Sequence, residues 1–161
     1  MRALPAGALI ILAAFATPPL AAQESASCST PRDACAFFDT FLTAFNRRDW
    51  DAFRATLADD ISVIFDSPEQ PERQDGRLAV ERFFQAIFPS PGLQPRPLPP
   101  PLKPDNLVAK DLGDVVIISF HLRAPDHVAR RTIVLHRTVS GWRVIHIHGS
   151  SFDLPSQPGG R

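Results

Sequence analysis

The sequence predicts an α+β domain in which helices come first and an antiparallel sheet follows. Two observations support this fold class. Apolar residues recur at helical spacing between residues 31 and 88, interrupted by one short β-branched segment. After residue 104 the apolar period changes to two, in four segments joined by short turns. Helices followed by a strand meander favour packing of the helices on one face of a curved sheet.

The chain begins with the pattern of a secretory signal peptide. Met1-Arg2 gives a basic start, residues 6–16 form an uncharged run (AGALIILAAFA), and the segment ends on small residues at Ala22. The run is shorter than the roughly 20 apolar residues of a membrane-spanning helix, and prolines follow it. We expect cleavage after Ala22, which makes residues 1–22 a signal peptide and the protein secreted or periplasmic, with no membrane segment afterwards.

The two cysteines fit an exported protein. In an oxidising compartment a single pair favours a disulfide between Cys28 and Cys35. Its expected role is to tie an N-terminal segment, residues 23–32, to the first helix of a domain spanning residues 33–155. The spacing is wider than the C-x-x-C of redox pairs, which argues against thiol chemistry. Residues 156–161 are expected to form a flexible tail.

The helical half is predicted from apolar stripes and their boundaries. Pro31-Arg32-Asp33 starts the first helix, because proline suits the first turn and an acid suits the helix N-terminus. Asp49 or Asp51 caps a short second helix. The expected elements are a helix from Arg32 to Arg48, a helix through Trp50, Phe53 and Leu57, a strand at Ile61–Phe65, a turn or exposed hairpin at Pro68–Gly76 and a helix at Arg77–Phe88.

A proline-rich segment separates the helices from the sheet. Eight of the sixteen residues from Pro89 to Pro104 are proline, which neither a helix nor a central strand tolerates. A stiff connector is the favoured interpretation, and a polyproline ligand for a partner is the alternative. The four strands expected after it are Leu107–Asp111, Val115–Arg123, Ala129–Thr138 and Trp142–His148.

Composition excludes two classes of function. Seventeen basic residues balance seventeen acidic ones, whereas a nucleic-acid-binding domain needs a net basic surface. The chain has 12 Phe and no Tyr, so catalysis by a phenol is excluded. No pattern in the sequence implies a cofactor.

Three segments carry a resemblance to a known family: FNRRDWDAF at residues 45–53, GRLAVERFF at residues 76–84 and GWRVIHIHGSS at residues 141–151. They resemble the SnoaL-like branch of the nuclear transport factor 2-like superfamily, over about residues 34–152. The last segment is also similar to the association domain of calcium/calmodulin-dependent protein kinase II. The resemblance implies a cone-shaped α+β fold and often a dimer. It does not imply one function, because isomerases, dehydratases, cyclases and assembly modules share this frame.

The chain departs from the family at positions that carry chemistry. The isomerase-like members use a pocket tyrosine, which is absent here. The kinase association domain has arginines where this chain has Ile133 and Gly149. Neither the isomerase machinery nor that anion pocket is therefore expected to carry over residue by residue.

Strand alternation assigns side chains to the two faces of the sheet. A three-residue loop at Val139–Gly141 would pair Thr138 with Trp142. The helix-covered face would then hold Ile133 opposite Ile147 and Leu135 opposite Ile145, together with Arg131, Arg137 and Arg143. The outer face would hold His121, Thr132, Val134, His136, Val144, His146 and His148.

The histidines have three interpretations. The favoured one places them on an apolar outer face that pairs with a second subunit, giving a homodimer. A register shifted by one residue would instead turn them into the pocket. A third possibility is a zinc or copper site at His136, His146 and His148.

The pocket expected between sheet and helices would be lined by Phe38, Trp50, Phe84 and Arg131 and would hold a small apolar ligand. The weak catalytic candidates are Asp66 or Asp39 as general base and Arg131 as oxyanion partner. Arg131 with one carboxylate could also bind a small acidic ligand, but a structural salt bridge between the two is the favoured interpretation of this pair. The sequence thus favours a small-molecule-binding or assembly protein, with a cofactor-independent lyase or isomerase acting on a small carbonyl compound, or a histidine-bound metal protein, as alternatives.

Overall fold

The computed structural model describes residues 31–66, 72–85, 88 and 100–155. The predicted signal peptide, Cys28, most of the proline-rich connector and the C-terminal tail lie outside these residues. The predictions made for them are therefore untested by the structure.

Three helices cover one face of the sheet. Helix α1 spans Arg32–Arg47 and ends at Arg48, whose φ of 58° is left-handed and whose N–H bonds the carbonyls of Ala44 and Phe45. Helix α2 spans Trp50–Ala55, and the carboxylate of Asp49 accepts the backbone N–H of Ala52 at 3.0 Å. Of the two caps considered, Asp49 is thus the one used. Helix α3 spans Arg77–Gln85.

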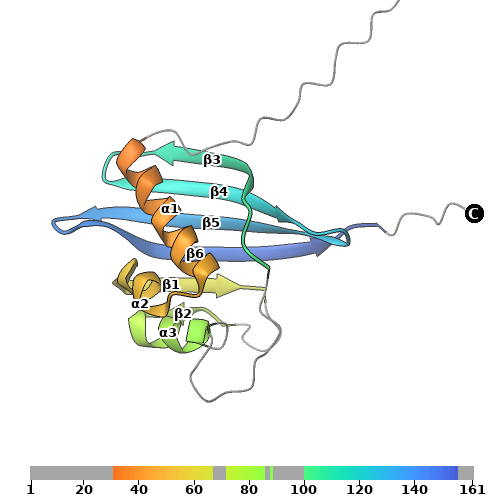
Figure 1. The fold of residues 1–161 in the computed structure, drawn as a ribbon, viewed down its shortest axis with the longest axis horizontal. Helices are drawn as coiled ribbons and strands as arrows, with labels where there is room; N and C mark the ends of the chain where they lie inside the picture. The colour runs from red at the N-terminus through yellow and green to blue at the C-terminus, as the bar shows by residue number, and fades with distance from the viewer. Residues whose placement is uncertain (1–30, 67–71, 86–87, 89–99, 156–161) are drawn as a thin grey trace, which may run out of the picture.

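The six strands form one sheet in the order β2-β1-β6-β5-β4-β3 (Figure 1). Strand β1 pairs in parallel with β6, and every other neighbouring pair is antiparallel. The strands are β1 Leu57–Phe65, β2 Gln74–Asp75, β3 Asp105–Asp111, β4 Val115–Arg123, β5 His127–Thr138 and β6 Gly141–Asp153. The predicted α+β fold, with N-terminal helices on a curved sheet, is confirmed.

The β5–β6 hairpin corrects part of the predicted register. Its turn has two residues, so Thr138 pairs with Gly141 instead of Trp142. A β-bulge at Ile145 then restores the predicted pairing of Ile133 with Ile147. Between the turn and the bulge, the side chains of β6 lie on the face opposite to the predicted one. Val144 is fully buried in the core rather than on the outer face, and it pairs with Leu135 in place of Ile145. Arg143 is not on the helix-covered side.

Phenylalanine dominates the core between helices and sheet. Phe38 and Phe53 are fully buried, and Phe53 contacts the rings of Phe41, Phe45 and Phe84 at centroid distances of 5.4, 5.8 and 4.9 Å. Such tilted and edge-to-face pairs add to the free energy gained from burying apolar surface. In Figure 1, α1 crosses the sheet on one side. No described helix covers the other side.

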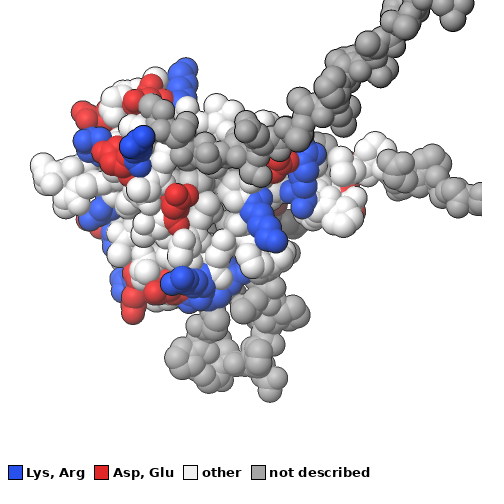
Figure 2. All heavy atoms as spheres, turned by 45° about the horizontal axis from the view of Figure 1, so that its top comes forward, with Lys and Arg blue, Asp and Glu red and all other residues white. Residues whose placement is uncertain are grey.

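Charged side chains of both signs are interspersed on the face that Figure 2 shows. This pattern matches the balance of 17 basic and 17 acidic residues in the chain. Within the described residues, no helix is both long enough and apolar enough to cross a membrane.

Candidate functional site

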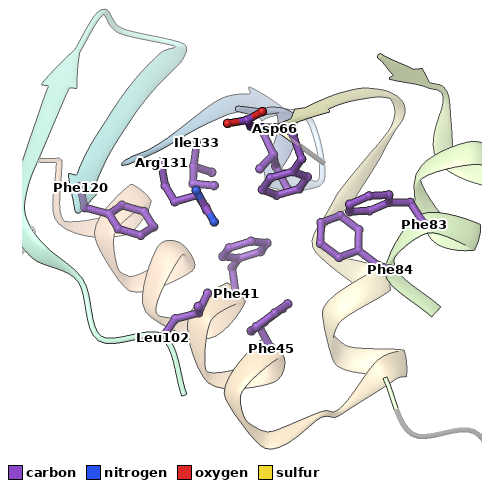
Figure 3. A pocket seen from close by; sticks show the side chains of 11 residues that line it. Phe41, Phe45, Asp66, Phe83, Phe84, Leu102, Phe120, Arg131 and Ile133 are labelled. Atoms are coloured by element: carbon purple, nitrogen blue, oxygen red, sulfur yellow. The ribbon is translucent and has the colours of Figure 1, made fainter. Parts of the chain in front are cut away.

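A cavity of about 290 Å³ lies between the sheet and the helices. Its size is at the lower end of the range for small-molecule sites. Helices α1 and α3, the end of β1 and the inner parts of β4, β5 and β6 contribute its walls (Figure 3). The lining residues are Phe41, Phe45, Phe65, Asp66, Phe83, Phe84, Leu102, Phe120, Arg131, Ile133 and Ile147.

Aromatic rings make up most of the cavity wall. Phe65 and Phe83 are stacked, with centroids 5.2 Å apart and planes 9° from parallel. Phe84 meets Phe83 edge-on at 5.1 Å and Phe65 at 6.2 Å. This wall favours a small molecule with apolar, preferably flat, surface.

The backbone of Leu102 is held beside the cavity by two hydrogen bonds with the Asn46 side chain. The Asn46 amide donates from Nδ2 to the Leu102 carbonyl at 3.0 Å and accepts the Leu102 N–H on Oδ1 at 2.7 Å. These two hydrogen bonds replace the strand partner that this part of the chain lacks. Asn46, at the end of α1, thereby positions one wall of the cavity.

Arg131 is the one basic side chain among the described residues that line the cavity. Its Nη1 donates to the carbonyls of Arg130 at 2.9 Å and Ser150 at 3.3 Å, and its guanidinium carbon lies 5.2 Å from the Phe65 ring centroid. Burial lowers the pKa of Arg131 from its usual value, yet an arginine keeps its charge in proteins. The cavity therefore has one positively charged wall.

Gly149 makes room for this arrangement. It pairs with Arg131 across β5 and β6. A Cβ at position 149 would lie 2.4 Å from the Phe65 ring and 2.9 Å from Nη1 of Arg131. Only glycine lets the ring and the guanidinium lie against the strand where they do.

Asp66 stands at the rim. Its backbone N–H donates to the Gly149 carbonyl at 3.1 Å, which fixes the end of β1 beside β6. The side chain is exposed, and in Figure 3 its carboxylate lies across the cavity from Phe41 and Phe45. It forms no ion pair with Arg131 within the described part of the chain. The salt bridge considered as a structural role for Arg131 and an aspartate is thus not formed.

The structure brings together three of the residues singled out in the sequence and separates three others. Phe84, Arg131 and Asp66 line the cavity. Phe38 is fully buried in the core behind it, and Trp50 packs on Phe53 and Phe88. Asp39 lines a separate surface depression on α1, which shares no residue with the cavity.

Several lining residues were not assigned to the pocket from the sequence, although strand alternation places two of them, Phe120 and Phe65, on the helix-covered face. Phe120 alternates with the buried Ile118, and Phe65 with the buried Val63, so both belong on the helix side. Leu102 had no such signal, because its placement depends on the distant Asn46 side chain.

The outer face carries the histidines. His146 pairs with Val134 and His148 with Thr132, while His136 is opposite Arg143. His146 Nδ1 shares a 2.8 Å hydrogen bond with Ser62 Oγ on β1. Burial lowers the pKa of His146, and the nearby charges of His148 and Arg73 lower it further. The charge of Asp75 raises this pKa, but by less.

The histidines do not form the metal site considered from the sequence. Among the described residues, no group of three His, Cys, Asp or Glu side chains is positioned to hold a metal ion. The strand pairing explains this. His148 is opposite Thr132, and Val134 separates Thr132 from His136 on β5, so His148 and His136 lie at different positions along the strands.

The sequence of residues 35–154 matches the SnoaL-like domain family. The chain belongs to this family. The match covers nearly the whole described part of the protein, which confirms the resemblance seen in the sequence. No curated protein is significantly similar in sequence to this SnoaL-like protein.

Solved structures agree on the fold of this SnoaL-like protein. An NTF2-like protein of unknown function from Pseudomonas putida KT2440 has 22% identity and a TM-score of 0.59, covering 71% of this chain and 81% of its own. A candidate dehydratase of the NTF2-like family from Streptomyces avermitilis has 17% identity and a TM-score of 0.57, covering 74% and 94%. A candidate calcium/calmodulin-dependent protein kinase type II association domain from Thiobacillus denitrificans has 26% identity and a TM-score of 0.54, covering 73% and 93%.

Proposed function

We propose that this SnoaL-like protein binds a small, mostly apolar molecule in the cavity between its helices and its sheet. The observation that carries this proposal is a cavity of about 290 Å³ walled by phenylalanine rings, with a single cation among the described lining residues. A concave, mostly aromatic wall with few polar groups is the usual composition of a small-molecule site.

The volume gives a scale for the part of the ligand that lies inside the cavity. With about 30 Å³ for each water-sized unit of liquid, the space accommodates on the order of ten non-hydrogen atoms. One or two fused rings, or a short branched chain, fit this space. Burial of such a ligand would gain about 25 cal/mol for each Å² of apolar surface removed from water.

Calorimetric titration with 2-naphthamide, a flat neutral probe, tests the proposal. In Ile133→Trp a larger side chain replaces one that lines the cavity, and we expect at least a tenfold loss of affinity. Val108→Trp places the same ring on an exposed position of β3 and should leave binding unchanged. Equal affinities for the wild type and for Ile133→Trp, with both folded, would exclude the cavity as the binding site.

The uncovered sheet face supports a homodimer as part of this function. Val115, Ile117 and Val134 lie on it, and none of the described helices covers them. An apolar surface of this kind is unfavourable in water and suits a partner. A second copy is the partner that we propose, since a sheet face can pair with its own symmetry copy.

Export of the protein is likewise proposed from its N-terminal residues. The order of basic, apolar and small residues in residues 1–22 supports a cleaved signal peptide, and the Cys28–Cys35 disulfide would then form in the oxidising compartment. Peptide mapping of the exported protein under non-reducing conditions would reveal both the cleavage site and the bond.

A second candidate function is a cofactor-independent lyase or isomerase. It is favoured by Asp66 and Arg131 lining one cavity, since a carboxylate can remove a proton while a guanidinium stabilises the developing oxyanion. The similarity to a candidate dehydratase from Streptomyces avermitilis points the same way. Turnover that Asp66→Asn abolishes and Asp39→Asn preserves would support it, because Asp39 lies outside the cavity.

A further inference from the structure

We propose that the ligand of this cavity carries one carboxylate, which binds to the free edge of the Arg131 guanidinium. This inference deepens the proposed function and depends on it. Three observations support it: the contacts that fix the Arg131 side chain, the N–H donors of Arg131 that have no acceptor among the described residues, and the apolar residues that surround it.

Two features hold the guanidinium in place before any ligand binds. Its Nη1 donates to the carbonyls of Arg130 and Ser150, and one of its faces lies over the Phe65 ring at 5.2 Å. Gly149 leaves the space that both groups need. A guanidinium fixed in this way loses little conformational entropy when it binds an anion.

One edge of the Arg131 guanidinium has no hydrogen-bond acceptor among the described residues. In the described part of the chain, neither Nε nor Nη2 of Arg131 makes a hydrogen bond, and Arg131 forms no ion pair. In Figure 3 the nitrogen-bearing end of Arg131 extends into the space above Phe41. A partly buried charge without a counter-ion is costly, and an anion in the cavity would offset that cost.

The same edge of another arginine shows which group fits. Arg54 binds the carboxylate of Glu81 through Nε at 3.1 Å and Nη2 at 3.4 Å. The two-pronged geometry matches the planar carboxylate, whose two oxygens accept parallel N–H donors. Arg131 offers these donors to the cavity instead of to a protein side chain.

The surroundings select for a single negative charge on an otherwise apolar molecule. Apart from Arg131, the described lining consists of phenylalanine, leucine and isoleucine and one acidic residue, Asp66, which stands at the rim. A second anionic group on the ligand would have no cation to meet within the described lining. The ligand class is therefore a small aromatic or branched aliphatic monocarboxylate.

The test compares two probes of the same shape on the full chain. Calorimetric titrations with 2-naphthoate and with 2-naphthamide measure the effect of the carboxylate alone. The wild type should bind 2-naphthoate at least tenfold more tightly than 2-naphthamide. The preference should disappear in Arg131→Gln and persist in Arg130→Gln, since Arg130 is exposed and lies over Phe152 on the other face.

The outcomes separate this inference from the proposed function. If the wild type binds 2-naphthamide as tightly as 2-naphthoate, or more tightly, the cavity remains a binding site and the carboxylate inference is wrong. The probe comparison on the wild type stands even if Arg131→Gln does not fold. If the preference persists in a folded Arg131→Gln variant, Arg131 is not the receptor. If neither probe binds, both the inference and the proposed function fail.

Discussion

Gly149 lies directly opposite Arg131 in the β5–β6 ladder, and the Arg131 guanidinium occupies the space that a Cβ at position 149 would need. The Phe65 ring shares that space. One residue without a side chain thus determines where both the cation and the aromatic wall of the cavity lie. This dependence can be tested directly.

Gly149→Ala should destabilise the protein by about 1–3 kcal/mol, the usual cost of adding a methyl group to a packed site. It should also reduce any preference for a carboxylate probe, because the added Cβ would lie 2.9 Å from Nη1 of Arg131. Urea unfolding gives the free energy, with Ser150→Ala on the neighbouring residue as control. A Gly149→Ala variant as stable as the wild type would show that Phe65 and Arg131 move aside freely.

The open face predicts a dimer that one charge can dissociate. Ile117 pairs with Val134 in the middle of that face. Ile117→Glu would bury an unpaired carboxylate in the subunit contact, so sedimentation should show a dimer for the wild type and a folded monomer for the variant. Val139→Glu, at the fully exposed hairpin tip, is the matched control. A wild-type monomer at micromolar concentration would exclude this interface.

His146 should make stability depend on pH. Burial, His148 and Arg73 lower its pKa in the folded protein below the ordinary 6.5. Below pH 6.5 the unfolded chain therefore binds more protons at this site than the folded one, so the free energy of unfolding falls as the pH falls. Above pH 6.5 both states are neutral at this site and its effect vanishes.

Urea unfolding at several pH values measures this dependence. His146→Asn should make the slope between pH 6.5 and 5 shallower than in the wild type, while His136→Asn changes an exposed imidazole on the same face and serves as control. An unchanged slope in His146→Asn would assign the pH dependence to other groups.

The ion pair of Arg54 and Glu81 should matter more than a surface pair. The Glu81 side chain is 9% exposed and that of Arg54 44%. Arg54→Met leaves a buried carboxylate without its partner, which should cost about 1–2 kcal/mol because water already screens the arginine. Arg73→Met at the exposed pair with Asp75 should cost well under about 1 kcal/mol. Equal costs would show that burial of Glu81 is not the deciding factor.

The sequence predicted the fold because local patterns and tertiary structure agree. The apolar stripe of α1 and the alternation in β4 and β5 reflect the faces that are buried. The pairing of Ile133 with Ile147 was also correct, so the strand region at the cavity was placed properly.

The predictions were wrong where a distant contact, or two compensating shifts in strand register, determine where a side chain lies. A two-residue turn shifted the hairpin tip by one position and the bulge at Ile145 shifted it back, so Val144 and Arg143 were assigned to the wrong faces. Trp50 was predicted to line the pocket, whereas its ring packs against Phe53 and Phe88. Asp39 lies beside the stripe of α1 but beyond the cavity. None of these outcomes follows from local spacing.

The most direct test of the binding account is an NMR measurement of contacts between 2-naphthoate and the methyl groups of the protein. The account predicts nuclear Overhauser effects from the naphthalene protons to the methyls of Ile133 and Ile147, which line the cavity. It predicts none to Val134, the neighbour of Ile133 that points to the outer face. Contacts to Val134 without contacts to Ile133 and Ile147 would place the ligand on the open sheet and contradict the account.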